Sequence, residues 1–112
     1  MLTVLDDDMK RVVREQRLGY VASVCPDGTP NLSPKGTTAV WDDDHLVFLD
    51  IFSPGTVANI EAGNRAVEVN VVDPIRRKGY RFKGPATVSV MSMPFALVCR
   101  SKSRTGSTLR AL

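Results

Sequence analysis

Short runs of alternating apolar residues, separated by close turn signals, constrain the fold of this chain more than any other feature. In 65–73, for example, Val67, Val69 and Val71 occupy every second position and alternate with Glu68, Asn70 and Val72. A period of two is typical of a strand that buries one face. We predict five strands on this basis, over 18–25, 31–41, 45–51, 65–73 and 79–90. Five short strands with close turns predict a mainly β chain, an antiparallel barrel or sandwich.

Two of the predicted strands contain residues that a regular ladder tolerates poorly. Pro34 and Gly36 interrupt the second strand, and Gly84 with Pro85 interrupts the fifth. Proline lacks the N–H that a ladder needs, and glycine weakens a strand interior. We therefore predict a bulge, or a backbone that faces a ligand, in the second strand. In the fifth strand we predict a bend or a bulge.

Two short helices are predicted outside the strands. The first covers 3–17, where Thr3 and Asp6 fit a capping box and the apolar residues lie near one stripe. The second covers 54–62, with Ser53 as N-cap and a proline at the first helical position. The unpaired N–H groups at such a start can hold a phosphate, but a well-capped short helix explains the same residues.

Length and composition restrict the class of protein. At 112 residues the chain has room for one domain, and no apolar run approaches the roughly 20 residues needed to cross a bilayer. The first residues are acidic, which argues against a signal peptide. Cys25 and Cys99 have no metal-ligand spacing. We therefore expect a cytoplasmic protein with reduced thiols and no membrane partner.

The net charge of +3 comes from the C-terminal part of the chain. Residues 91–112 contain no acidic residue and four basic ones, Arg100, Lys102, Arg104 and Arg110. The remaining residues, 1–90, therefore carry one net negative charge, which argues against a nucleic-acid-binding face. The segment 91–112 also shows no clear helix or strand period. We predict a domain over 1–90, followed by an atypical basic tail that is disordered or ordered only by a partner chain.

The second predicted strand carries a polar segment that suits a phosphate or polyol ligand. Lys35 supplies a point charge, Gly36 allows close backbone approach, and the nearby hydroxyl groups can donate hydrogen bonds. These hydroxyl groups belong to Ser33, Thr37 and Thr38. The spacing is not that of a Walker A loop. A bulged edge strand with solvated polar residues explains the same composition, so both interpretations stand.

Other reactive residue types form no catalytic pattern. His45 is the sole histidine and follows the acidic turn 42–44, so a surface role is favoured over catalysis or metal binding. Cys25 precedes a Pro-Asp-Gly turn, and no basic partner is evident in the sequence. We predict no metal site and assign no catalytic residue.

The order of these elements, with three motifs, resembles the pyridoxamine 5′-phosphate oxidase-like family of FMN-binding split barrels. The similarity covers roughly 5–90, and its motifs are Asp27-Gly28-Thr29-Pro30 leading into Ser33-Pro34-Lys35-Gly36-Thr37, then 53–60, and 79–86. The resemblance implies an antiparallel split β-barrel of about six strands, with Greek-key connections and two short helices. It also implies a homodimer with FMN in a groove at the dimer interface.

Carried over to this chain, the resemblance implies two walls of a cofactor site. One wall would comprise Ser33, Lys35, Gly36, Thr37 and Thr38, and the other Asp50, Ser53, Thr56 and Asn59. Family members that oxidise pyridoxamine phosphate usually carry an Arg-Lys pair at the helix start. This chain has Pro54-Gly55-Thr56 there, so phosphate binding would depend on the helix N-terminus, Ser53, Thr56 and Lys35.

These features imply a small FMN-binding flavoprotein, an oxidoreductase related to pyridoxamine 5′-phosphate oxidase with an unassigned substrate and electron donor. The redox chemistry would belong to the flavin. A non-catalytic module that binds or stores flavin, deazaflavin or haem fits the same residues, as does an empty structural homodimer. Whether the chain is an enzyme is open at this point.

Overall fold

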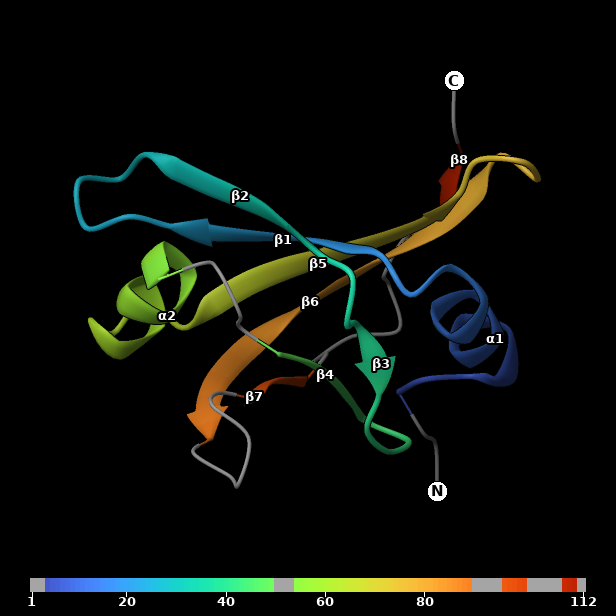
Figure 1. The fold of residues 1–112 in the computed structure, drawn as a ribbon, viewed down its shortest axis with the longest axis horizontal. Coiled ribbons are helices and arrows are strands. Elements are labelled where there is room, and N and C mark those ends of the chain that lie inside the picture. The colour runs from blue at the N-terminus through green and yellow to red at the C-terminus, as the bar shows by residue number, and fades with distance from the viewer. Residues whose placement is uncertain (1–3, 50–53, 90–95, 101–107, 111–112) are drawn as a thin grey trace.

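Antiparallel strands dominate the structure, and the two helices lie at opposite ends of the molecule (Figure 1). The computed structural model describes residues 4–49, 54–89, 96–100 and 108–110. The elements are α1 (Asp7–Gln16), β1 (Gly19–Val24), β2 (Pro30–Lys35), β3 (Ala39–Val40), β4 (His45–Leu49), α2 (Pro54–Glu61), β5 (Ala66–Asp73), β6 (Lys78–Ser89), β7 (Ala96–Arg100) and β8 (Thr108–Arg110). In the described part of the chain, neither helix is long and apolar enough to span a membrane.

Seven strands pair in the order β2-β1-β5-β6-β7-β4-β3, and β8 adds to β6. Strand β6 changes partner along its length: Lys78 to Pro85 pair with β5, and Ala86 to Ser89 pair with β7. The change follows Gly84 and Pro85, where the sequence predicts a bend or bulge. Among the described residues β2 and β3 do not pair, so the sheet is not closed between them. The predicted mainly β, antiparallel split-barrel class is confirmed.

The predicted second strand, 31–41, is two strands in the structure. β2 ends at Lys35, a turn occupies Gly36 and Thr37, and β3 begins at Ala39. β2 pairs with β1, whereas β3 pairs with β4. The prediction of one bulged strand was therefore wrong. Proline is tolerated in β2 because β2 is an edge strand, and the glycine belongs to the turn that carries the chain between two parts of the sheet.

The segment 91–112 contains two strands, although its sequence shows no strand period. β7 lies between β6 and β4 and pairs with both, and β8 pairs with the first residues of β6. Backbone pairing with neighbouring strands defines these elements, whatever their side-chain pattern. The interpretation of this segment as a tail without strands is corrected for 96–100 and 108–110.

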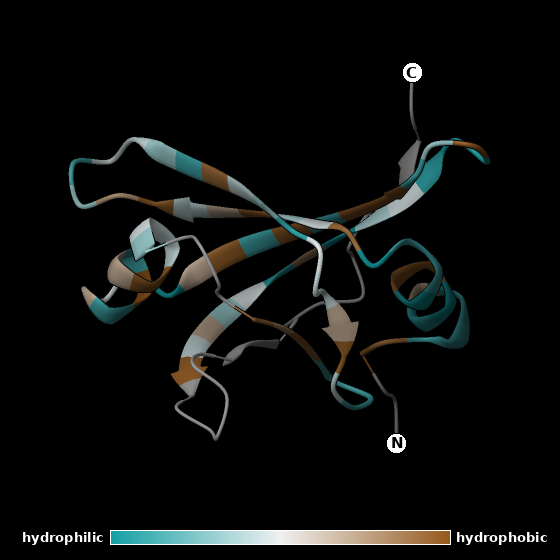
Figure 2. Cartoon of the chain, in the orientation of Figure 1, coloured by the Kyte–Doolittle hydropathy of each residue, from teal (hydrophilic) through white to brown (hydrophobic). Residues whose placement is uncertain are grey.

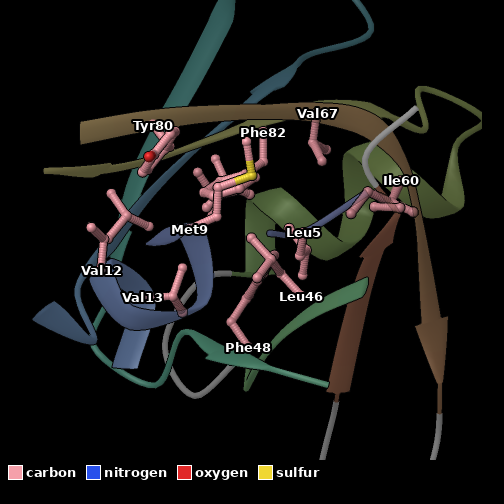
Figure 3. Close-up of a cluster of buried hydrophobic side chains, with 14 of the residues drawn as sticks. Leu5, Met9, Val12, Val13, Leu46, Phe48, Ile60, Val67, Tyr80 and Phe82 are labelled. Atoms are coloured by element: carbon pink, nitrogen blue, oxygen red, sulfur yellow. The ribbon is translucent and has the colours of Figure 1, made fainter. Parts of the chain in front are cut away.

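One hydrophobic core joins α1, α2 and the inner faces of the strands. Figure 2 shows hydrophobic and hydrophilic stretches alternating along α1 and β5, and Figure 3 shows the buried side chains meeting between these elements. The core comprises Leu5, Met9, Val12, Val13, Val21, Leu46, Phe48, Val57, Ile60, Val67, Val69, Val71, Tyr80, Phe82 and Ala86. The apolar stripe predicted for the first helix is confirmed by the burial of Met9, Val12 and Val13.

Helix α1 starts and stops at residues with clear capping roles. The Asp6 carboxylate accepts a hydrogen bond from the Met9 backbone N–H at 2.8 Å, so Asp6 is the N-cap. The capping box was predicted one turn earlier, from Thr3, which lies outside the described residues. The helix ends at Gln16, and the C-cap Arg17 has a left-handed φ of 61°.

A polar contact ties α1 to β6 across the edge of the core. The Tyr80 hydroxyl donates to the Asp8 carboxylate, and Arg11 pairs with the same carboxylate at 2.6 Å. These donors lower the pKa of Asp8 to about 2, the tyrosine hydroxyl first and the guanidinium second. Burial, followed by the hydrogen bond to Asp8, raises the pKa of Tyr80 to about 12.

We expect this contact to limit stability at both ends of the pH range. Asp8 binds its proton less readily in the folded state, so its contribution is complete above the ordinary pKa of 3.8 and is lost as pH falls toward 2. Tyr80 binds its proton more readily in the folded state, so its contribution to stability is complete below pH 10.0 and is lost as pH rises through 12.

Urea unfolding across pH should show a decrease in the free energy of unfolding at alkaline pH in wild type and a smaller decrease in Tyr80→Phe. An equal decrease in both would contradict the expectation, and Tyr20→Phe, at a half-exposed tyrosine, is the control.

Candidate functional site

The inner face of β2 carries a row of polar side chains that leads from α2 toward the β2–β3 turn. Asn31, Ser33 and Lys35 occupy alternate positions of β2 and therefore share one face of the strand. The last of them, Lys35, is only 4% exposed. A buried ammonium group is stable only beside polar or anionic groups, so this face of β2 must provide such groups around Lys35. The row is the side of the predicted cofactor wall that faces the protein interior.

Helix α2 packs on this row through hydrogen bonds rather than through a purely apolar face. The Asn31 amide donates to the Thr56 hydroxyl at 3.2 Å, and the hydroxyls of Ser33 and Thr56 lie 3.3 Å apart. Thr56 is fully buried. The start of α2 is thus joined directly to β2, and a ligand can lie beside this contact but not between the two hydroxyls.

One turn further along α2, a second contact joins the helix to β1. The Asn59 amide donates to the Ser23 hydroxyl at 3.0 Å and lies 3.6 Å from the Cys25 sulfur. The Asn31 amide donates to the same Ser23 hydroxyl at 3.2 Å. Ser23 and Asn59 are both buried, so this cluster belongs to the interior of the protein.

The β2–β3 turn meets the end of β4. The Thr37 hydroxyl accepts from the Leu49 backbone N–H at 2.9 Å and donates to the Leu49 carbonyl at 3.3 Å. The Thr38 hydroxyl donates to the Lys35 carbonyl at 2.7 Å and is buried. A Cβ added to Gly36 would meet nothing within 4 Å, so this turn leaves space for a ligand to approach the backbone.

The structure brings some of the predicted site residues together and separates others. Ser33 and Thr56, from the two predicted walls, are in hydrogen-bond contact. Thr37 touches the end of β4, the residue before Asp50. Asn59 instead donates to Ser23 of β1 and lies near Cys25, the residue after that strand. Asp50 and Ser53 lie outside the described residues, so their positions stay predictions.

Sequence reasoning did not select Ser23 and Asn31, which hold the two walls in register. A signal for Ser23 was present: it occupies the third inward position of β1, after Gly19 and Val21, where an apolar residue is the usual choice. A polar residue at an inward strand position indicates a buried hydrogen-bond partner. That partner could not be identified from the sequence, because Asn59 is 36 residues away.

The residues weighed as reactive groups take structural roles. The His45 ring nitrogen Nδ1 lies 2.7 Å from an Asp42 carboxylate oxygen at the surface, in line with the predicted surface role. Among the residues that the structure describes, no cluster of three or more His, Cys, Asp or Glu side chains could hold a metal ion.

Comparison with known proteins places this architecture in a family. The sequence profile of pyridoxamine 5′-phosphate oxidase matches residues 5–105. The crystal structure of HupZ from Group A Streptococcus is similar, with a TM-score of 0.81 and 25% identity over 96% of this chain and 99% of that chain. An F420 reductase has a TM-score of 0.70 and 21% identity, over 88% of this chain and 97% of that chain.

An FMN-binding protein from Syntrophomonas wolfei shares the fold at lower identity. Its TM-score is 0.71 with 10% identity, over 83% of this chain and 79% of that chain. No curated protein sequence matches the chain significantly. The profile match extends over most of the chain and includes all of the described elements except β8. The resemblance seen in the sequence is thereby confirmed, and the chain belongs to the pyridoxamine 5′-phosphate oxidase family.

Proposed function

We propose that this protein binds FMN and acts as a flavin-dependent oxidoreductase of unassigned substrate. The observation that carries the proposal is the polar row on β2, joined to the start of α2, in a chain of this family. Two solved structures of the same fold are named as an FMN-binding protein and an F420 reductase, which supports a flavin-type ligand. When bound, FMN supplies the hydride and electron transfer, and the protein supplies binding and orientation.

The chemistry of the described side chains fits the phosphate end of FMN. Lys35 is a cation, and Ser33 and Thr37 carry hydroxyls that can donate to anionic oxygens. None of the described residues in this row is a carboxylate, so nothing there repels a phosphate. Lys35 would hold the phosphate by charge, and the hydroxyls would orient it. Asp50 and Ser53 remain proposed members of the second wall, and the buried Thr56 supports the site through its contact with Ser33.

The cofactor assignment is tested on the purified protein. We expect a yellow protein that releases a compound with the mass of FMN, and turnover of reduced nicotinamide with an electron acceptor. A released deazaflavin or haem would assign a different cofactor. Bound FMN without turnover would favour the binding or storage role. A colourless protein that takes up no added FMN would contradict the proposal.

Replacing Lys35 with alanine should weaken FMN binding by tenfold or more, because a charge-assisted contact to the phosphate is lost, worth about 1.5–3 kcal/mol. Flavin fluorescence titration gives the Kd. Lys10→Ala is the matched control, since Lys10 lies on α1 and pairs with Asp43. Equal Kd values for the two variants would show that the phosphate lies elsewhere.

We also propose that the protein is a homodimer and that the outer face of β2, β1, β5 and β6 forms its interface. This face exposes large apolar side chains, at Leu18, Tyr20, Val24 and Leu32. A groove of about 420 Å³ lies beside them, lined by residues that include Ala22, Pro30, Ala66 and Pro85. Apolar patches of this kind commonly mark interaction surfaces.

Charge on the same face favours a second copy of the chain as the partner. Leu32, Ala22, Glu68 and Lys83 follow one another across the sheet in a single row. Glu68 and Lys83 lie 3.5 Å apart, so a twofold axis near this row can bring opposite charges of two copies together.

The interface is tested by placing a charge in it. Wild type should elute at twice the mass of the chain in light-scattering chromatography, and Leu32→Lys should shift toward the monomer, because an exposed leucine at the interface is replaced by a cation. Ile75→Lys is the control, since Ile75 lies in the β5–β6 turn and is 89% exposed. A monomeric wild type, or a dimer unaffected by Leu32→Lys, would contradict this interface.

A further inference from the structure

The hydrogen bonds between β1, β2 and α2 form a chain with a defined direction. It runs from the two amide groups of Asn59 and Asn31 to the hydroxyls of Ser23, Thr56 and Ser33. An amide nitrogen can only donate, whereas a hydroxyl has one hydrogen to donate and lone pairs that accept. The two asparagines therefore decide in which direction the hydroxyl hydrogens point.

Thr56 is the residue at which the direction is set. Its hydroxyl accepts from the Asn31 amide at 3.2 Å, which leaves its own hydrogen to be donated. Thr56 is 0% exposed, so this hydrogen needs an acceptor inside the protein. The Ser33 hydroxyl oxygen, 3.3 Å away, provides one. Ser33 is partly exposed, so its hydroxyl hydrogen can be donated to water or to a ligand instead of to Thr56. Either hydroxyl could donate at this distance, and the difference in burial favours Thr56 as the donor and Ser33 as the acceptor.

The consequence is that the Ser33 hydrogen is free to point away from α2. We propose that Asn31 is a positioning residue that keeps Ser33 as a hydrogen-bond donor toward an anionic phosphate oxygen. This inference rests on the proposed binding of FMN and adds to it the residue that orients the phosphate contact. Lys35, two positions along the same face of β2, supplies the charge, and Ser33 supplies the directed donor.

Two substitutions of Asn31 test the proposal through binding affinity. Asn31→Asp has nearly the same shape but can only accept, so the Thr56 hydrogen turns toward it and Ser33 must donate to Thr56. Asn31→Ala removes the donor without adding charge. For both variants the Kd for FMN should rise about tenfold, the value of one hydrogen bond to a charged group. The Kd for riboflavin, which lacks the phosphate, should change less than about threefold.

Two further comparisons separate positioning from a purely structural role. Asn64→Asp is the charge-matched control: Asn64 donates to the Val24 carbonyl at 3.0 Å, outside this chain of hydrogen bonds, and both Kd values should stay close to wild type. Ser33→Ala should lose as much FMN affinity as Asn31→Ala, and the double variant should lose no more than either.

The outcomes are distinct. Loss of FMN and riboflavin affinity in equal measure would show that Asn31 merely supports the fold, and additive losses in the double variant would show that it acts independently of Ser33. Either result overturns the proposal and leaves FMN binding intact. Wild type that binds FMN no more tightly than riboflavin would overturn both the proposal and the phosphate site on which it rests.

Discussion

Replacing Phe48 with alanine is expected to lower the free energy of unfolding by about 3–5 kcal/mol. Phe48 lies on β4 and is 0% exposed, in a cluster with Leu46 and with Val13 of α1 (Figure 3). Removing the ring loses its transfer free energy and leaves a cavity that strands on both sides cannot easily fill. Because total stability is commonly about 5–15 kcal/mol, this single change should remove a large part of it.

Urea unfolding followed by circular dichroism gives the change in unfolding free energy. Ile75→Ala is the control, because Ile75 is 89% exposed and its truncation should change stability by less than about 0.5 kcal/mol. If Phe48→Ala and Ile75→Ala unfolded at the same urea concentration, β4 would not be part of the core as described.

Replacing Gly79 with alanine is expected to destabilise the protein by about 2–3 kcal/mol. A Cβ added at Gly79 would lie 2.5 Å from the Val71 carbonyl oxygen and 2.9 Å from the Val72 Cα, both backbone atoms of β5. These atoms are held by the β5–β6 ladder, so the strands must separate to relieve the clash. The clash outweighs the roughly 0.5–1 kcal/mol that alanine ordinarily gains over glycine within a strand.

A second glycine in the chain provides the opposite expectation. A Cβ added at Gly36 meets no atom within 4 Å, so Gly36→Ala should leave the unfolding midpoint unchanged or raise it slightly. Thermal unfolding of the two variants should therefore shift in different directions or by clearly different amounts. Similar midpoints would show that β5 and β6 approach less closely at this point than the structure has them.

Elements with a regular side-chain pattern were predictable from the sequence. The apolar stripe and acidic first turn of α1 identified a helix, and the alternation in 65–73 identified β5 to within a residue at its start. Gly84 and Pro85, where the sequence predicts a bend or a bulge, coincide with the point at which β6 changes partner. In each case the decisive property is local, because it depends on residues within one or two turns of the chain.

Elements defined by their partners were not predictable in the same way. The run 31–41 was interpreted as one strand, yet its two halves pair with β1 and β4 in different parts of the sheet. β7 was missed because its sequence has no alternating pattern, although two neighbours hold its backbone. The choice of a strand's partner depends on residues far away in the chain, which periodicity does not report.

The candidate site divides along the same line. Composition identifies Ser33 and Lys35 on β2 and Thr37 in the turn that follows, because hydroxyls and a cation suit a phosphate. The roles of Ser23 and Asn31 emerge only from contacts across the fold, and Asn59 lies among interior partners that its place in the sequence did not suggest.

By itself, the sequence determined the mainly β class, the two helices, the family and the chemical character of the polar row on β2. The class, the helices and the polar character follow from local side-chain pattern and composition, which any fold of the chain must accommodate, whereas the family follows from the resemblance of its motifs and element order. Tertiary structure alone decided that β2 and β3 part at Gly36, that β7 enters the sheet, and that Asn31 joins Ser23 to Thr56. A hydrogen bond needs its two groups within about 3 Å, and only the packing of distant segments brings these groups so close.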